Sequence, residues 1–382
     1  MSHYAVTNPA TGEVEETFAT YSDEQVETAL DGAQIAFEQW GRTSSKAERS
    51  ALLRRVADLY EERKEELADI IHHEMGKLPE ECLAEVEFSG AIYRYYADNG
   101  EFFLEDAPIQ REAEGSAVIR KLPIGPLFGV MPWNYPYYQV ARFAAPNLML
   151  GNTILLKHAS LCPKSSAAME RIFLDSGFPN GAFTNLYITN EQSAAVIADH
   201  RVRGVSLTGS ERAGVAIASE AGAALKKVVC ELGGSDPFIL LSTDDMDATV
   251  AAAIGGRYEN CGQICNGAKR FIVVDSLYDE FLSRFAKASE KLELAPLCSK
   301  AAAEHLAEQV REAVESGATL ALGDGVNDGA YFRPAILTDI PEESPARYEE
   351  FFGPVAQFYR VKDETEAVKV ANDTVYGLGS YV

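Results

Sequence analysis

Two cysteines four residues apart, Cys261 and Cys265, stand in the segment ENCGQICNGAKR at residues 259–270. A thiol in a glycine-containing loop can act as a nucleophile, and two thiols can hold a metal or form a disulfide. The spacing is not CxxC, no second Cys/His pair lies near it, and the six histidines form no ligand pattern. A zinc site is therefore not expected. For each thiol, the residues alone leave open a nucleophile and a buried, unreactive side chain.

Four other stretches carry residue types that suit catalysis or ligand binding. Asn134, in PWNYP, offers an amide on a loop stiffened by two prolines, which suits an oxyanion site or a structural aromatic turn. Lys157, in LLKHAS, could contact a ribose or phosphate or simply end a strand at the surface. Gly209 and Ser210, in SLTGSERAG, predict a helix N-terminus that binds phosphate or is merely capped. Glu231, before the double glycine of CELGGSD, is a candidate general base or a solvated strand-end acid.

These residues require elements that bring them to one edge of a sheet. From residue 125 onward, apolar runs alternate with amphipathic segments, and the expected strands are GPLFGVM, NTILLKHA, TNLYIT and VRGVSLTG. Repeated β-α units with apolar strands predict a parallel, doubly wound sheet, in which ligands collect at the carboxyl ends of the strands. A second α/β run is expected from about KKVVCELGGSDPFIL onward.

The rest of the chain is expected to be mainly helical before this sheet. Residues 23–99 predict helices, including a long amphipathic one in KAERSALLRRVADLYEERKEELADIIHHEMGK with a kink or break near its middle. The stretch APIQREAEGSAVIRKLPIG alternates apolar and polar residues and predicts an antiparallel excursion. An exposed strand pair of this kind is a natural pairing edge for a partner subunit.

Composition narrows the function classes. The 382 residues include 58 acidic and 34 basic side chains, a net charge of -24, which disfavours nucleic-acid binding. No apolar run is long enough to cross a bilayer, so no membrane association is expected. The N-terminal sequence lacks the pattern of a signal or transit peptide, which predicts a cytoplasmic location. The six scattered cysteines are accordingly expected to be reduced thiols.

Six motifs, in order along the chain, resemble those of the aldehyde dehydrogenase superfamily: PWNYP, LLKHAS, LTGS, ELGGSDPFI, GQIC and EEFFGPV. The resemblance covers essentially the whole length and is strongest to bacterial succinate-semialdehyde dehydrogenases. It implies an α/β fold with a Rossmann-type NAD(P)-binding domain, an α/β catalytic domain and a small β excursion for oligomerisation. The implied ranges are 1–106 and 124–229 for the cofactor domain, 107–123 for the excursion and 230–382 for the catalytic domain, which is expected to be incomplete at its C-terminal end.

The resemblance also implies a catalytic scheme. Cys265, in the GQxC position, would attack the aldehyde carbonyl, and the Asn134 side chain and the Cys265 backbone N–H would hold the oxyanion. Glu231 would activate the water that hydrolyses the resulting thioester. Arg142, in YYQVARFAAP, would pair with the distal carboxylate of a semialdehyde substrate or, alternatively, with an internal acid.

The cofactor implied by the resemblance is NAD or NADP. Lys157 and Glu350 would contact the riboses, Gly209 and Ser210 the pyrophosphate, and Trp133 would line the channel. Ser160 stands where many NAD-preferring relatives carry a glutamate that would repel a 2'-phosphate, so the serine leaves room for NADP.

The expected function is therefore NAD(P)+-dependent oxidation of an aldehyde, with succinate semialdehyde as the favoured substrate, by a homo-oligomer that is a dimer or a tetramer. Glu259 occupies the place where some relatives have a second arginine, which leaves other short semialdehydes open. A catalytically silent relative is the alternative from another functional class. Cys261 is expected to be a passive thiol, with a regulatory disulfide to Cys265 as the alternative.

Overall fold

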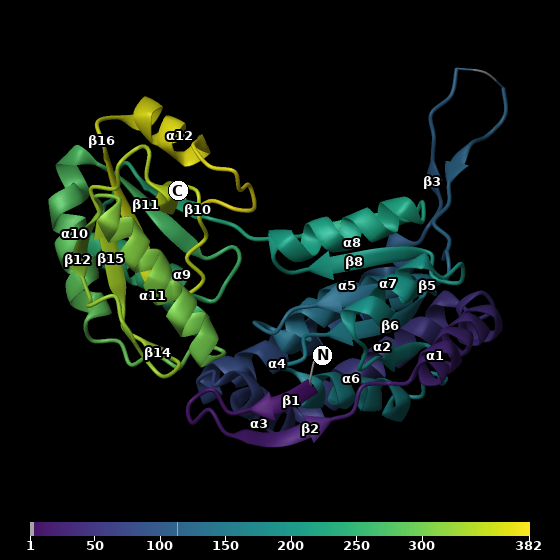
Figure 1. The fold of residues 1–382 in the computed structure, drawn as a ribbon. Coiled ribbons are helices and arrows are strands. Elements are labelled where there is room, and N and C mark those ends of the chain that lie inside the picture. Colours follow the sequence, from purple (N-terminus) through teal and green to yellow (C-terminus); the bar gives the residue numbers. More distant parts are fainter. Residues whose placement is uncertain (1–3, 113) are drawn as a thin grey trace. The chain divides into compact units, whose positions relative to one another are not determined.

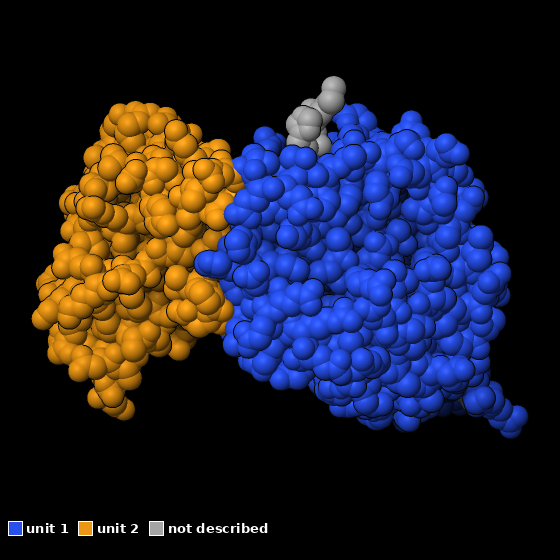
Figure 2. Space-filling model, turned by 90° about the horizontal axis from the view of Figure 1, so that it is seen from below, with its two compact units in different colours: residues 1–7, 14–74, 82–231 blue, residues 8–13, 75–81, 232–382 orange. Residues whose placement is uncertain are grey.

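The structure, a computed structural model, describes residues 4–112 and 114–382. The chain forms two compact units, which Figure 2 colours separately. Unit 1 comprises residues through Thr7, 14–74 and 82–231, and unit 2 comprises 8–13, 75–81 and 232–382. The roles of the units as cofactor and catalytic domains stay predictions.

Unit 1 is built on a sheet of five parallel strands, as the alternating apolar runs predict. The strand order is β7-β6-β5-β8-β9, so the first of these strands along the chain, β5, lies in the centre, and the later strands are added on both sides of it. The strands are β5 (Pro126–Met131), β6 (Thr153–His158), β7 (Phe183–Asn185), β8 (Gly204–Thr208) and β9 (Lys227–Glu231). The expected domain boundary at 229/230 falls inside β9, all of which pairs with β8. The second α/β run therefore begins after β9 rather than with it.

The helices of unit 1 follow the predicted periodicity. The long amphipathic segment is broken at Arg63, where the last backbone N–H bonds back to Leu59, which confirms the predicted break. The first helix ends in a π-helical turn at Phe37–Gly41. The α-helices that lie wholly or mainly in this unit are α1 (Asp23–Ala36), α2 (Lys46–Glu62), α3 (Lys64–Met75), α4 (Pro79–Phe103), α5 (Pro136–Leu150), α6 (Pro163–Asp175), α7 (Asn190–Ala198) and α8 (Glu211–Ala223).

Two small antiparallel pairs accompany this sheet. The pair β1 (Tyr4–Thr7) and β2 (Val14–Phe18) lies at the N-terminal end of the described chain. The predicted excursion contains β3 (Ala107–Pro108) and β4 (Val118–Ile119), which pair antiparallel and extend outward from the body of unit 1 (Figure 1). Both β4 residues are about half exposed, which leaves an apolar edge on this hairpin.

Unit 2 is built on a mixed sheet in the order β10-β11-β16-β15-β12, in which only β12 runs antiparallel to its neighbour. Apolar side chains on both faces pack against the helices and are fully buried, among them Phe271 and Ile272 of β11, the strand next to the central β16. The elements are β10 (Asp236–Leu240), α9 (Met246–Tyr258), the 3-10 helices Glu259–Gly262 and Pro345–Arg347, β11 (Ala268–Val274), α10 (Asp275–Ser289), α11 (Lys300–Glu315), β12 (Thr319–Leu322), β13 (Asn327–Asp328), β14 (Tyr331–Phe332), β15 (Ala335–Thr338), β16 (Val355–Val361) and α12 (Glu364–Asn372). Over residues 4–112 and 114–382, we find no helix with the length and apolar character that crossing a membrane requires.

Candidate functional site

The carboxyl edge of the unit 1 sheet gathers most of the predicted site residues. Strand register places Met131 opposite His158 and Thr208 opposite Glu231, so strands β5, β6, β8 and β9 end at the same edge. The segments that follow these strand ends carry the candidates. They are Trp133 and Asn134 after β5, Lys157 and Ser160 at and after the end of β6, Gly209 and Ser210 after β8, and Glu231 at the end of β9.

The loop that carries Asn134 is fixed by a buried acid. The Asn134 side chain is 4% exposed, and α5 begins two residues later at Pro136. Oε1 of Glu85, from α4, accepts hydrogen bonds from the backbone N–H groups of Tyr137 (2.9 Å) and Tyr138 (3.3 Å). A carboxylate at a helix N-terminus satisfies otherwise unpaired N–H groups and interacts favourably with the helix dipole. The sequence reasoning missed Glu85, because its partners lie about fifty residues away in the chain.

A buried histidine joins the same loop to the end of β6. Nδ1 of His158 accepts from the backbone N–H of Ala159 (2.9 Å), so Nε2 carries the proton and donates to the carbonyl of Pro136 (3.1 Å). Burial lowers the pKa of His158 to about 4, which keeps the imidazole neutral near pH 7. His158 therefore fixes the loop as a neutral side chain with one donor and one acceptor.

The residues predicted to bind a cofactor offer donors suited to ribose and phosphate. Lys157 has its pKa lowered by burial, and its ammonium lies 5.9 Å from the centre of the Tyr4 ring. Ser210 caps α8 by accepting from the backbone N–H of Ala213 (3.3 Å), and the N–H of Gly209 donates to the Glu231 carbonyl (3.0 Å). An ammonium, two serine hydroxyls and a helix N-terminus form a donor set that fits the ribose and phosphate groups of a dinucleotide.

Arg142 and Glu231 face each other in a cavity of about 410 Å³ in unit 1. Nη1 of Arg142 lies 3.7 Å from Oε2 of Glu231, and Nη2 donates to Oγ1 of Thr208 (3.1 Å). The Glu231 side chain is 42% exposed, so its carboxylate keeps contact with water and incurs no large cost of burial. Arg142 thus has an internal acid as a partner and also keeps an exposed surface that a carboxylate ligand can reach.

In unit 2, the two cysteines of residues 259–267, named the nucleophile loop here after the predicted role of Cys265, have different environments. Cys265 is half-buried, whereas Cys261 is 2% exposed and burial raises its pKa to about 12. Asn260 and Cys261 both adopt left-handed backbone angles (φ 50° and 53°), which are unfavourable for residues other than glycine. All six cysteines are unbridged thiols, as the sequence predicts. Cys261 is therefore held as a neutral, inaccessible thiol.

The nucleophile loop is fixed by side chains from several elements. The buried guanidinium of Arg257 donates to the carbonyls of Gly262 (2.9 Å), Ala268 (3.2 Å) and Gly353. Gln263 donates to the Asn260 carbonyl (3.2 Å) and accepts from the backbone N–H of Cys298 (2.9 Å). Oε1 of Glu81 accepts from the backbone N–H of Asn260 (2.7 Å). These contacts hold the left-handed residues in place.

Glu350, which the resemblance assigns to a ribose, lies in unit 2 beside the same loop. Its side chain is 18% exposed, and burial raises its pKa while Lys269 opposes that rise. Oε1 lies 3.1 Å from the Lys269 ammonium and accepts from the backbone N–H of Gly234 (3.2 Å). The predicted residues therefore form two groups, with Cys265 and Glu350 in unit 2 and all the others in unit 1.

Sequence reasoning missed Glu85, His158, Arg257 and Lys269. Lys269 and Arg257 did leave a signal, because each is a charged residue within a mainly apolar element, and the structure buries both side chains. Glu85 left none, since the helix that it caps is encoded far away in the sequence.

Comparison with known proteins gives consistent matches. The sequence model of the aldehyde dehydrogenase family matches residues 1–382. A succinate-semialdehyde dehydrogenase (NADP(+)) of Deinococcus radiodurans is 47% identical, covering 99% of this chain and 82% of the relative, and a probable one of Synechocystis sp. is 41% identical, covering 98% and 85%. The crystal structure of succinic semialdehyde dehydrogenase from Streptococcus pyogenes in complex with NADP+ matches with a TM-score of 0.95 at 40% identity, covering 99% and 85%.

Proposed function

Because the chain belongs to the aldehyde dehydrogenase family, we propose that it oxidises succinate semialdehyde to succinate with NADP+ as the electron acceptor. The substrate and cofactor are supported by the names of relatives that are 47% and 41% identical. The observation that carries the proposal is Cys265, a partly exposed thiol on a loop whose carbonyls are held by buried cationic side chains. A fixed backbone favours attack on a carbonyl in one orientation.

In this proposal, the Cys265 thiolate attacks the aldehyde carbon, and the carbonyl electrons move to oxygen. The Asn134 amide and the Cys265 backbone N–H donate to that oxyanion. When bound, NADP+ supplies the acceptor for the hydride, a proton with two electrons, that leaves the carbon. Glu231 then accepts a proton from the water that attacks the thioester, and the Cys265 thiolate leaves as succinate forms. The exposed Glu231 carboxylate suits this role, because water reaches it directly.

The preference for NADP+ is attributed to two residues at and just after the end of β6 in unit 1. Ser160 offers a hydroxyl, and Lys157 offers an ammonium, where a glutamate would repel a 2'-phosphate. Gly209 and Ser210 would hold the pyrophosphate at the start of α8, Trp133 would line the channel, and Glu350 would contact a ribose. These assignments follow the family resemblance and the donor types present.

Arg142 is proposed to bind the distal carboxylate of the substrate. Its guanidinium borders the cavity in unit 1 and remains 31% exposed beside Glu231 and Thr208. A guanidinium binds carboxylates through paired N–H donors, which favours a semialdehyde over an aldehyde without a second charged group.

The test is turnover of succinate semialdehyde with NADP+ or NAD+, measured as absorbance of the reduced nicotinamide. We expect faster turnover with NADP+, loss of turnover in Cys265→Ala, and retention of turnover in Cys261→Ala, which removes a buried thiol from the same loop. Faster turnover of another short semialdehyde would correct the substrate. Nicotinamide binding without turnover of any aldehyde, or no binding by a folded chain, would favour the silent relative.

We propose in addition that the chain forms a homo-oligomer through the β3–β4 hairpin. Val118, Ile119 and Leu122 are each at least half exposed on this hairpin or just after it, which is an unusual exposure for apolar side chains on an antiparallel edge. Light scattering of the protein and of a Val118→Lys variant would test this, because a charge at the edge should dissociate the oligomer.

A further inference from the structure

Lys269 is a buried lysine four residues after Cys265, and the proposed chemistry gives it no role. Its ammonium nitrogen donates to the carbonyls of Ile264 (2.7 Å) and Cys265 (2.8 Å). It lies 3.1 Å from Oε1 of Glu350, and its side chain is 1% exposed. The three donors of the ammonium group therefore meet three acceptors, two of which are backbone atoms of the nucleophile loop.

Stability gives only a weak reason for a lysine at this position. Removing an ammonium from water is unfavourable, and burial lowers the pKa of Lys269 to about 8 although Glu350 opposes that change. Buried ion pairs can often be replaced by apolar side chains of similar volume without loss of stability. The charge at Lys269 is better explained by what it contacts than by the folding energy it contributes.

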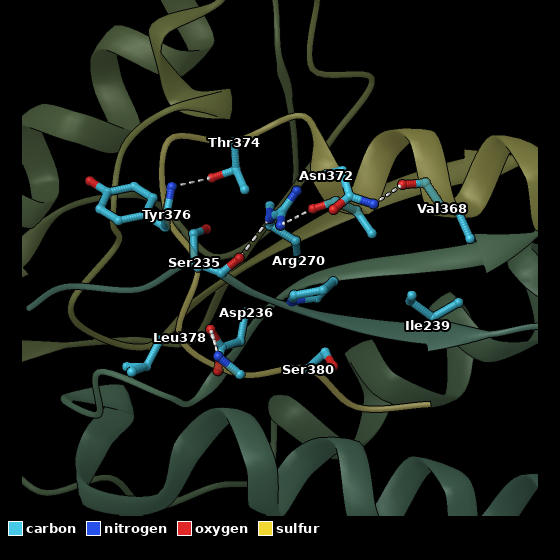
Figure 3. Close-up of a pocket in the computed structure, with 14 residues that line it drawn as sticks. Ser235, Asp236, Ile239, Arg270, Val368, Asn372, Thr374, Tyr376, Leu378 and Ser380 are labelled. Atoms are coloured by element: carbon cyan, nitrogen blue, oxygen red, sulfur yellow. Dashed lines mark hydrogen bonds between the residues drawn. The ribbon is translucent and has the colours of Figure 1, made fainter.

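The neighbouring residue Arg270 shows what a purely structural cation does in the same strand. Arg270 is also buried, but it donates to the carbonyls of Ser235 (2.7 Å), Val370 (2.9 Å) and Ala371 (2.8 Å), none of which belongs to the nucleophile loop. Figure 3 shows the contact of Arg270 with Ser235 beside a pocket that is lined by residues of β10, α12 and the C-terminal segment. Successive side chains of a strand point to opposite faces, so the adjacent cations serve different parts of unit 2.

Gly233 and Gly234, the double glycine that follows Glu231 and Leu232, pack against the groups that surround Lys269. A Cβ atom on Gly234 would overlap the Cys265 carbonyl oxygen, and one on Gly233 would overlap the Glu350 carboxylate. The backbone of Gly233 and Gly234 therefore packs directly against two of the three partners of Lys269, and the N–H of Gly234 donates to Glu350 (3.2 Å). Close backbone approach of this kind admits only glycine.

We infer that Lys269 is a positioning residue, which fixes the peptide group of Cys265 and places a positive charge beside it so that the thiolate is favoured and correctly oriented. The inference rests on the proposed function, in which Cys265 is the nucleophile. Glu350 holds the ammonium in place, so Lys269 also links Cys265 to the acid that the resemblance assigns to the cofactor. The charged groups that face Lys269 are Glu350, Arg257 and Asp236.

Alkylation of Cys265 by iodoacetamide tests this inference without any substrate. The rate is followed from about pH 6 to 10, and peptide mass spectrometry identifies the modified cysteine. In Lys269→Met, we expect the pH midpoint of Cys265 alkylation to rise and its rate at pH 7 to fall about tenfold, as a shift of one pKa unit gives. Lys269→Arg should recover most of the rate. Arg270→Met, the matched control in the same strand, should retain the wild-type profile even where it lowers thermal stability.

An unchanged alkylation profile in a folded Lys269→Met protein would overturn the inference and leave Lys269 as a structural ion pair. Should this variant fail to fold, Lys269→Gln keeps a donor without the charge and should show the same upward shift. An alkylation shift in these variants, together with no turnover of succinate semialdehyde by the wild-type protein, would refute the proposed substrate and leave the inference standing.

Discussion

Glu231 and Glu350 are both candidate site acids, and their surroundings differ. Glu231 ends β9 in unit 1 with 42% of its side chain exposed, and its nearest cation, Arg142, is 3.7 Å away. Glu350 in unit 2 is 18% exposed, with the Lys269 ammonium at 3.1 Å and the Gly234 N–H at 3.2 Å. The first carboxylate keeps room for water, whereas one oxygen of the second is engaged by two donors of the protein.

This difference separates a group that can react from a group that holds others in place. An exposed, loosely paired carboxylate contributes about 0–1 kcal/mol to stability through its ion pair, so its loss should affect chemistry far more than folding. Removing one partner of a buried pair leaves the other charge uncompensated and is strongly destabilising. The two acids should therefore respond to the same substitution in opposite ways.

Glu231→Gln should have the largest effect on activity. A general base contributes about 10²- to 10⁴-fold to rate, so steady-state turnover should fall by that factor while thermal stability stays close to wild type. Rapid mixing should still show a first burst of reduced nicotinamide, and mass spectrometry should detect the thioester on Cys265. Normal turnover in Glu231→Gln would remove this acid from the catalytic assignment.

Glu350→Gln should show the reverse pattern in stability. Loss of the partner of buried Lys269 should reduce the free energy of unfolding by about 3 kcal/mol, as measured by urea denaturation. Glu349→Gln is the matched control, since the neighbouring carboxylate accepts a hydrogen bond from the neutral Gln309 amide (3.3 Å) and its loss should change stability little. Equal stability of the two variants would show that the folded protein does not need Glu350 to compensate the buried charge of Lys269.

Glu74, near the end of α3, extends the comparison to an acid that is 1% exposed and that accepts from backbone N–H groups at the start of α6. Burial raises its pKa to about 7, although Ser165, the backbone N–H of Lys164 and the Lys164 charge lower it. The folded chain therefore keeps a proton that the unfolded chain loses above about pH 4.3, so this contribution to stability falls as pH rises towards 7 and is constant above it. The unfolding free energy of the wild type minus that of Glu74→Gln should decrease by roughly 3 kcal/mol from the lower to the upper end of that window.

The control for Glu74 is Glu66→Gln, on the exposed face of the same helix, α3. The same measurement on Glu66→Gln over the same pH range gives the baseline against which the Glu74→Gln difference is compared. A pH-independent difference for Glu74→Gln would show that the Glu74 carboxyl ionises alike in the folded and unfolded chains.

Arg142→Gln should have the smallest effect and should depend on the substrate. Losing a charged hydrogen-bond partner costs about 1.5–3 kcal/mol in binding, so KM for succinate semialdehyde should rise at least about tenfold. KM for butyraldehyde, which has the same chain length without a carboxylate, should change little. A similar rise for both aldehydes would mean that Arg142 acts through Glu231 instead.

Local sequence signals were enough for the fold. The apolar runs that became β5, β6 and β8 and the Ser210 cap of α8 depend on a few neighbouring residues, and their types fix them. TNLYIT, residues 184–189, was predicted as a strand, but the strand found is Phe183–Asn185, and Thr189 is already the N-cap of the next helix. The placement of β9 in the first sheet depends on its pairing with β8, which no local pattern encodes.

The candidate site could be predicted only for residues that lie inside a motif of the family. Cys265 and Glu231 lie in such motifs, and the family resemblance identified them. Lys269 lies four residues after the GQIC motif, but its role depends on Glu350, eighty-one residues later, and on the close approach of Gly234. Contacts between distant segments decide which charged side chains are buried together, and a single sequence does not display them.

The hydrogen bonds of His158 also make its ring orientation matter. Turning the imidazole by half a turn would place carbon atoms where Nδ1 and Nε2 now meet the Ala159 N–H and the Pro136 carbonyl, and both bonds would be lost. Only one orientation of one tautomer therefore joins the end of β6 to the start of α5. His158 consequently joins the loop that carries Asn134 to the turn that carries Ser160. A change that moves either segment should therefore also displace the other.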